Sequence, residues 1–270
     1  MRRTRATVTS APPVAASATI QERRASFRAL HASGCFLLPN PWDIGGAQRL
    51  ERMGFKAIAS SSSACAQALG REDYQISLPQ ALEHLRMLVG ATQLPVNADF
   101  ENGFAAEPER VADHVRLAIA TGIAGLSIED RADQGLHDPV RAAERVAAAK
   151  QAIIATGEDV MLVARTEAYF EGETRVAPVI DRLQRYAAAG ADCLYAPGVT
   201  DIRDIAEIVR AVAPLPVNVL LYGQSMRVAE LAAVGVRRVS LGGALAAASW
   251  CGFDAAARRF LEHGSLPVPG

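Results

Sequence analysis

Charged side chains stand at the ends of several short apolar runs in this sequence. One run ends in Asp99-Phe100-Glu101, a second in Glu129-Asp130 and a third in Arg165-Thr166-Glu167. Each run has the length of a buried strand, and a stretch with helical spacing follows it. In a barrel of alternating strands and helices, the carboxyl ends of neighbouring strands converge on one mouth. The sequence therefore predicts several carboxylates and one guanidinium at a single site, where a cation or an anionic ligand must balance their charge.

The same unit recurs from about residue 34 onward: an apolar run, a polar turn, an amphipathic stretch and a small-residue stop. Eight such units with nearly continuous apolar strands predict a parallel sheet closed on itself, a (β/α)8 barrel of the TIM type. The alternative, an open doubly wound sheet, lacks the GxGxxG turn expected after its first strand. The predicted strands cover 35–38, 56–61, 95–100, 125–130, 160–166, 193–197, 216–221 and 237–242.

The length, net charge and composition of the chain limit the classes of protein to which it can belong. The chain has 270 residues, half of them apolar, and barrels of this type reach that size as one domain. The net charge of −1 gives no reason to expect nucleic acid or an anionic membrane as a partner. No apolar run approaches the roughly 20 residues that span a bilayer. The four cysteines are widely separated, which argues against disulfides or structural zinc and favours a reducing cytoplasm.

The N-terminal segment differs in composition from the rest of the chain. The first twenty or so residues are basic, rich in Ala, Ser, Thr and Pro, and lack the apolar core of a secretory signal. An organellar transit peptide shares this composition. We predict instead a disordered extension over residues 1–22, followed by one catalytic barrel domain over residues 23–270.

Lysine and histidine are poorly placed for several common chemistries. The only two lysines, Lys56 and Lys150, fall at a strand start and within a helical stretch, which argues against a Schiff-base aldolase. Of the five histidines, only His137 falls in a strand-to-helix loop, and no pair has metal-ligand spacing. Oxygen ligands remain, and these favour magnesium or manganese over zinc.

Three acids are the candidate metal ligands. Asp99 and Glu101 are two residues apart, so both side chains point the same way, and Glu129 ends the adjacent strand. Alternatively, these acids cap the following helices or pair with Arg165 and Arg131. Because three neighbouring strand ends are involved together, we favour the metal site.

Two other strand ends carry groups that suit an anionic ligand. Arg165 offers a bidentate grip on a carboxylate and stabilisation of a developing enolate oxygen. The serines 60–63 predict either a helix N-cap or a cradle of backbone N–H groups around a substrate carboxylate. Residues 240–243 (SLGG) end the eighth run, where barrels often bind phosphate, although these glycines can equally serve close backbone packing.

Read in order, these strand ends resemble the isocitrate lyase/phosphoenolpyruvate mutase superfamily over roughly residues 25–262. The resemblance implies magnesium held by Asp99 and Glu129, with Asp73 acting mainly through water. It also implies a metal-chelating 2-oxo or 2-hydroxy acid and a bond broken next to a pyruvate-like enolate. The segments that carry the resemblance are 39–43 (PNPWD), 61–63 (SSS) with 69–73 (LGRED), 97–103 (NADFENG), 127–130 (SIED) and 164–167 (ARTE).

The chain departs from the well-known branches of this superfamily. Asn97 replaces the first Asp of the metal pair, a loss of charge for which Glu101 compensates. The loop 131–139 (RADQGLHDP) carries neither the catalytic cysteine of the isocitrate lyases nor the lysine and Asn-Ser or Asn-Thr pair of the mutases. Tyr195 stands near the position where the lyases have Glu and the mutase has His. Both of those activities are therefore disfavoured.

We predict a Mg²⁺-dependent carbon–carbon lyase or decarboxylase, with Mn²⁺ as the alternative ion. Its substrate is a small 2-oxo or 2-hydroxy dicarboxylate, similar to oxaloacetate or a substituted malate. A phosphonopyruvate-like P–C substrate and a non-catalytic metal-carboxylate binder are the alternatives. The resemblance also implies a homodimer or homotetramer whose subunits exchange the last helix. The predicted catalytic residues are Arg165, Glu129, His137 and Tyr195, the substrate contacts Trp42, Ser61, Ser62, Ser63, Asn97 and Asn218, and the metal ligands Asp99, Glu129, Asp73 and Glu101.

Overall fold

The computed structural model describes residues 18–223 and 225–266. Residues 1–17, which make up most of the expected N-terminal extension, lie outside the described residues. Helix α1 (Ile20–Leu30) begins within the last part of that expected extension. Thr19 and Glu22 form a capping box there, in which each side chain accepts a hydrogen bond from the backbone N–H of the other residue.

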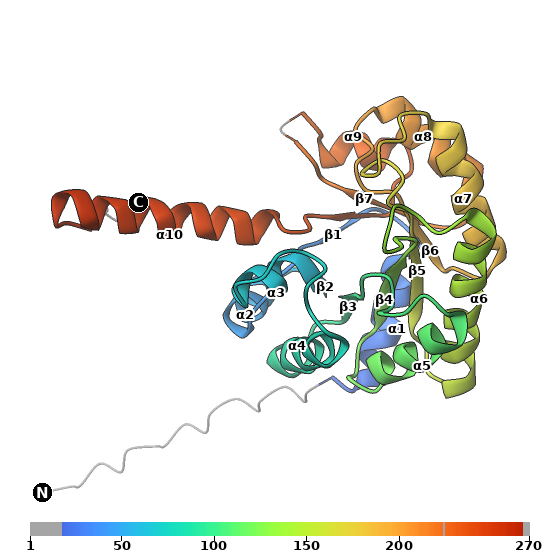
Figure 1. Ribbon diagram of the computed structural model, residues 1–270, viewed down its shortest axis with the longest axis horizontal. Coiled ribbons are helices and arrows are strands. Elements are labelled where there is room, and N and C mark those ends of the chain that lie inside the picture. The colour runs from blue at the N-terminus through green and yellow to red at the C-terminus, as the bar shows by residue number, and fades with distance from the viewer. Residues whose placement is uncertain (1–17, 224, 267–270) are drawn as a thin grey trace, which may run out of the picture.

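Eight parallel strands form the barrel that the repeated apolar runs predicted (Figure 1). Their order in the sheet is β1-β8-β7-β6-β5-β4-β3-β2. The Ala59 N–H donates to the Pro39 carbonyl at 3.0 Å, which links the second strand to the end of the first. The predicted TIM-type fold is therefore confirmed. The strands are β1 (Phe36–Leu38), β2 (Ile58–Ala59), β3 (Val96–Asp99), β4 (Gly125–Glu129), β5 (Met161–Arg165), β6 (Cys193–Tyr195), β7 (Val217–Leu220) and β8 (Arg238–Ser240).

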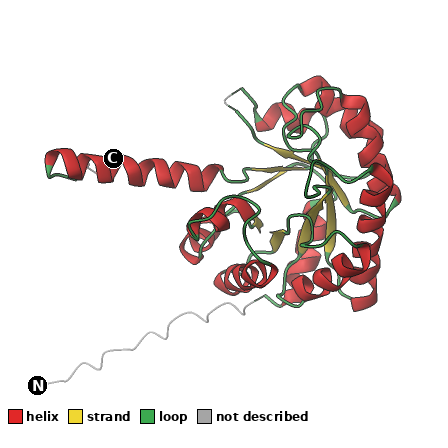
Figure 2. Ribbon diagram, in the orientation of Figure 1, coloured by secondary structure: helices red, strands yellow, loops and turns green. Residues whose placement is uncertain are grey.

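Helices follow the strands and cover the outside of the barrel (Figure 2). Their apolar faces pack on the sheet; in α5, for example, Val111, Val115 and Ala118 are fully buried. Helix α1 closes the amino-terminal end of the barrel, where Phe27 packs on Leu38 and Met161. The remaining helices are α2 (Ile44–Arg52), α3 (Ser62–Ala68), α4 (Leu78–Ala91), α5 (Pro108–Ile119), α6 (Pro139–Thr156), α7 (Val176–Ala188), α8 (Ile202–Val212), α9 (Val228–Ala233) and α10 (Ala244–His263).

Close packing explains the glycine that begins β4. A Cβ atom at Gly125 would lie 2.7 Å from the Phe27 ring and 2.8 Å from the Asn97 side-chain oxygen. Neither neighbour has room to move, because Phe27 and Asn97 are themselves buried. A glycine is therefore required where α1 meets the sheet.

The last helix, α10, extends away from the barrel instead of packing along it (Figure 1). Its apolar side chains are consequently open to solvent: Phe253 is 64% exposed and Phe260 63%. Exchange of this helix between subunits stays a prediction. None of the described helices is both long and apolar enough to cross a membrane.

Candidate active site

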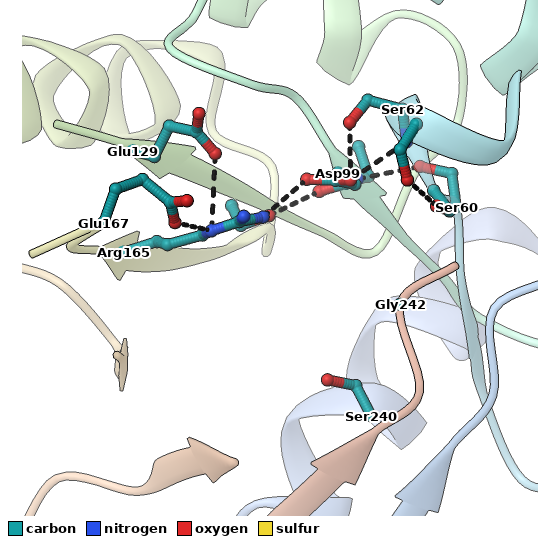
Figure 3. Close-up of polar contacts among 12 residues, drawn as sticks. Ser60, Ser62, Asp99, Glu129, Arg165, Glu167, Ser240 and Gly242 are labelled. Atoms are coloured by element: carbon teal, nitrogen blue, oxygen red, sulfur yellow. Dashed lines mark hydrogen bonds and ion pairs between the residues drawn. The ribbon is translucent and has the colours of Figure 1, made fainter. Parts of the chain in front are cut away.

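Three carboxylates surround one guanidinium at the mouth of the barrel (Figure 3). Arg165, at the end of β5, places its Nη1 3.3 Å from Asp99 Oδ1 and its Nε 3.3 Å from Glu129 Oε2. The Nε also pairs with Glu167, two residues further along the chain. β3, β4 and β5 are neighbours in the sheet, so the ends of all three meet at this point. The convergence expected from the sequence is present in the fold.

Asp99 is fixed by the serines that end β2. Its Oδ2 accepts hydrogen bonds from the Ser62 backbone N–H at 2.9 Å and from the Ser62 hydroxyl at 2.8 Å. The Asp99 backbone N–H donates to Ser60 Oγ at 2.8 Å. Ser61 is the N-cap of α3, since its hydroxyl accepts from the Ala64 N–H. The backbone N–H of Ser62, expected to contact a substrate carboxylate, is thus bound to Asp99.

Two buried carboxylate oxygens lack a partner. Glu101 Oε1 and Glu129 Oε1 have no hydrogen-bond partner among the described residues, although both side chains are buried. Burial, together with the negative charges of Asp99 and Glu129, raises the pKa of Glu101 to about 8. Burial also raises the pKa of Glu129, with Glu167 and Asp99 adding to the rise and Arg165 opposing it. Full ionisation of these carboxylates would give the site more negative charge than Arg165 alone balances, so their charged forms need a further cation.

This donor set fits a hard divalent cation in its chemistry. Oxygen ligands suit Mg²⁺ or Mn²⁺, and a cation would satisfy the unpaired oxygens of Glu101 and Glu129. Among the described residues, no group of three or more His, Cys, Asp or Glu side chains is already arranged as a metal centre. Asp73 faces the same cluster from the loop after α3, and burial and the charge of Asp99 raise its pKa.

Tyr195 lies next to the charged group, at the end of β6. Its ring centroid is 5.3 Å from the Arg165 guanidinium carbon, and burial raises the pKa of its hydroxyl to about 12. Tyr195 and Arg165 line a cavity of about 30 Å³ that reaches into the barrel, together with Ser127 and Ser240. Of the two predicted proton donors, Tyr195 is the one that the fold brings to the carboxylates.

Asn97 and Asn218 are both buried, and Asn97 lines the same small cavity as Asp99 and Arg165. Both side-chain oxygens accept hydrogen bonds from the buried Arg238, at 3.3 Å and 2.9 Å. The Asn218 Nδ2 donates to Ser240 Oγ at 3.0 Å. Both asparagines thus hold Arg238 inside the barrel, which the sequence did not indicate because Arg238 falls at the start of a strand.

Trp42 and His137 are not brought to the carboxylate group. Trp42 lines a separate, largely apolar pocket of about 470 Å³ with Leu69 and Met87. His137 lines a different cavity, of about 520 Å³, beside Gln134, and burial, followed by the charge of Arg145, lowers its pKa. These two predictions relied on position along the chain, and the catalytic and substrate-contact roles of the two residues stay predictions.

Three residues of the site are absent from the predicted catalytic, substrate-binding and metal-binding residues. Glu167 pairs with Arg165, and Ser60 supports the Asp99 backbone. Tyr74, on the loop between α3 and α4, lies close enough to Glu129 for each group to shift the pKa of the other. The sequence places the charge of Glu167 two residues beyond Arg165 at the same strand end, and this spacing could have indicated its role. Nothing in the residues around Tyr74 indicates the site.

Behind the mouth, Asp130 ties the ends of β4 and β5 to the outer helices. Its Oδ2 accepts from the hydroxyls of Thr166 and Tyr186, each at 2.6 Å, and from Arg182 Nη1 at 3.2 Å. Its Oδ1 accepts from the Glu167 backbone N–H at 2.9 Å. Asp130 is fully used by these contacts, so its part is to hold Glu167 and thereby Arg165 in place.

A barrel with a carboxylate-rich mouth around a buried arginine defines a class of small-acid enzymes, and the comparisons with known proteins agree. The family model described as phosphoenolpyruvate phosphomutase matches residues 27–261. The chain belongs to this family, and the predicted membership of the isocitrate lyase/phosphoenolpyruvate mutase superfamily is confirmed.

The relatives cover most of the chain. An uncharacterized protein of Mycobacterium tuberculosis is 33% identical, over 90% of this chain and 91% of its own. Oxaloacetate decarboxylase of Pseudomonas syringae is 32% identical, over 82% of this chain and 78% of its own. A solved structure from Burkholderia cenocepacia, described only as a lyase/mutase, is 42% identical with a TM-score of 0.89, over 93% of this chain and 94% of that one. The predicted class, a carbon–carbon lyase of this superfamily, is supported by the relative with a named activity.

Proposed function

We propose that this protein is a divalent-metal-dependent carbon–carbon lyase or decarboxylase. Its substrate would be a small 2-oxo or 2-hydroxy dicarboxylate similar to oxaloacetate or a substituted malate. The observation that carries the proposal is the pair of unpartnered, buried carboxylate oxygens of Glu101 and Glu129 beside Arg165. Carboxyl groups whose ionisation needs a further cation suit a metal ion chelated by an acid. The activity of the 32% identical oxaloacetate decarboxylase supports the same class of substrate.

Asp99, Glu129 and Glu101 would hold the metal ion, with Asp73 in support through water. A bound Mg²⁺ or Mn²⁺ would act as a Lewis acid that lowers the energy of negative charge on the substrate's 2-oxo oxygen. Asp99 is suited to this position because Ser62 fixes its second oxygen. Glu129 keeps one oxygen toward Arg165 and the other without a partner.

Arg165 would stabilise the enolate that forms when the carbon–carbon bond breaks. Contacts with Asp99, Glu129 and Glu167 fix its guanidinium before any substrate binds, so no reorganisation is needed during the reaction. Tyr195 would then donate a proton to the carbon atom of the enolate. The raised pKa of Tyr195 keeps that hydroxyl protonated at neutral pH.

Decarboxylation is the simplest reaction that this site supports. The electrons of the breaking bond pass to the substrate oxygen, and carbon dioxide leaves without needing an acid. This fits a chain whose loop after β4 lacks the catalytic cysteine of the isocitrate lyases. Cleavage of a substituted malate is the nearest variant.

Phosphorus–carbon chemistry is the second candidate, because the matching family is the phosphomutase family. A phosphoryl group needs cations at the mouth, and the loop after β4 and the first turn of α6 supply Arg131 and Arg141. Arg131 already pairs with Glu171 at 2.7 Å, and Arg141 pairs with Glu107 and Glu144. These pairings favour the carbon acid.

The proposal also covers the oligomeric state and the location of the protein. A homodimer or homotetramer would cover the apolar side chains that α10 leaves exposed. A cytoplasmic location, expected from the separated cysteines, stays a prediction.

The deciding experiment measures release of 2-oxo acids from C4 to C7 dicarboxylates and from phosphonopyruvate, with Mg²⁺ and with EDTA. Asp99→Ala is the blank, and Asp113→Ala, an exposed acid on α5, is the matched control. Metal-dependent turnover of a carbon acid that vanishes in Asp99→Ala and survives in Asp113→Ala supports the proposal. Turnover of phosphonopyruvate alone moves the protein to the P–C branch. No turnover by a metal-loaded protein indicates a non-catalytic binder.

A further inference from the structure

Tyr74 has a backbone conformation that favours glycine. Its φ is +62°, in the left-handed region, and it lies on the loop between α3 and α4. For a residue with a large side chain this conformation is unfavourable, and it persists only where the surroundings hold it. The unfavourable backbone conformation of Tyr74, beside the candidate site, therefore points to a role for its side chain there.

The side chain of Tyr74 joins loops that lie on different sides of the mouth. The guanidinium carbon of Arg131, on the loop after β4, lies 4.4 Å from the centroid of the Tyr74 ring. Arg131 in turn pairs with Glu171, on the loop after β5, at 2.7 Å. The Tyr74 hydroxyl lies close enough to the carboxylate of Glu129 for the two groups to shift each other's pKa. Tyr74 thus has Arg131 over the face of its ring and Glu129 near its hydroxyl.

This position places the ring beside the charged groups that would bind the substrate. The carboxylates of Glu129 and Glu167 and the guanidinium of Arg165 all act electrostatically on the Tyr74 hydroxyl, and burial is the largest cause of its raised pKa. The side chain is half-buried. A ligand that binds Arg165 must therefore share the mouth with this ring.

We propose that Tyr74 is a specificity-determining residue that limits the size of the acid entering the site. The ring fills the space that a branched substituent on the carbon next to a bound carboxylate would need. The site consequently selects small, unbranched dicarboxylates. This inference rests on the proposed function in that it takes the bound ligand to be a dicarboxylate, and it names the class of substrate within that proposal.

A pair of unreactive probes separates ring size from chemistry. Malonate and isopropylmalonate carry the same two carboxylates and differ only in one branched group. Their dissociation constants would be measured by calorimetry with Mg²⁺ present, for the wild type and for Tyr74→Gly, Tyr74→Asn and Tyr74→Phe. Gly and Asn both tolerate a positive φ, so at least one of them should keep the fold, which thermal unfolding would verify. Phe keeps the ring and removes only the hydroxyl.

We expect the wild type to prefer malonate by about 10-fold or more, in the range that one or two misplaced methyl groups produce in a closed pocket. Tyr74→Gly and Tyr74→Asn should bring the ratio of the two dissociation constants close to one, and Tyr74→Phe should leave it as in the wild type. An unchanged ratio in both small variants would overturn the inference. So would an equal loss of preference in Tyr74→Phe, or a wild type that binds neither probe.

Binding is measured without turnover, so this result does not depend on catalysis. A protein that discriminates the two probes through Tyr74 but converts no acid would refute the proposed reaction and support the size limit. A protein that decarboxylates an acid, but whose ratio of dissociation constants does not change when Tyr74 is replaced, would support the proposed reaction and refute the size limit.

Discussion

Replacement of Arg165 by lysine tests whether the guanidinium is needed for its shape or only for its charge. Arg165 contacts Asp99 through Nη1 and both Glu129 and Glu167 through Nε, so its two ends serve different carboxylates. A lysine has one ammonium group, which cannot occupy both ends, and at least one charge-assisted hydrogen bond is lost. Such a bond contributes about 1.5–3 kcal/mol. If it is used in the transition state, its loss lowers the rate by about 10- to 150-fold.

The loss of a preorganised donor for developing charge is of similar size, about 10²-fold or more in kcat. We therefore expect Arg165→Lys to lower kcat by on the order of 10²-fold, with KM changed much less. Because the positive charge remains among the buried carboxylates, the unfolding temperature should fall only slightly. Arg165→Ala, by contrast, leaves buried carboxylates without a cation and should lower the free energy of unfolding by about 3–5 kcal/mol.

Steady-state kinetics on the acid identified in the panel gives kcat and KM, and thermal unfolding measures stability. Arg116→Lys is the matched control, since Arg116 also pairs with a carboxylate but lies exposed on α5, and we expect no change there. A kcat for Arg165→Lys close to that of the wild type would refute the role of the guanidinium.

Three further predictions concern stability. Gly125→Ala should lower the free energy of unfolding by about 1–3 kcal/mol, because its Cβ would lie 2.7 Å from the Phe27 ring; an unchanged denaturation midpoint would contradict the packing argument. Asp130→Ala should cost about 3–5 kcal/mol and also reduce kcat, since Arg182 loses its buried partner; Asp113→Ala is the control. Burial, followed by the charge of Arg238, lowers the pKa of His31 to about 3 from 6.5. Because the unfolded chain binds the extra proton, this contribution to stability is complete above pH 6.5 and falls as the pH drops toward 3, and His31→Gln should flatten the slope of urea midpoint against pH.

The barrel and the centre of its mouth were readable from the sequence for a physical reason. A buried parallel strand must be apolar throughout, so a charge at its end is conspicuous, and parallel strands bring their carboxyl ends together. Asp99, Glu129 and Arg165 follow from those two facts. Their mutual contacts of 3.3 Å confirm the predicted convergence, whereas the metal they are proposed to bind stays a prediction.

Trp42, His137 and Tyr74 lie in loops, where no periodicity in the sequence fixes the direction of a side chain. His137 and Trp42 belong to segments at the correct end of the barrel, but their side chains line other pockets. Tyr74, near Glu129, has a left-handed backbone conformation that no pattern of residue types predicts for a tyrosine. Asn97 lies on the same face of β3 as Asp99 but two residues earlier, so it lines the same cavity and also accepts a hydrogen bond from the buried Arg238.

The outward course of α10 links the stability of this fold to its concentration. A helix with Phe253 and Phe260 in contact with water gains little from its own barrel. If the same side chains are covered by a second copy, association stabilises the folded state by mass action, and the unfolding temperature rises as more protein is present. We expect dilution to lower that temperature and chain truncation after Gly243 to remove its dependence on concentration. The working amount of this enzyme in a cell would then help to determine how much of it is folded.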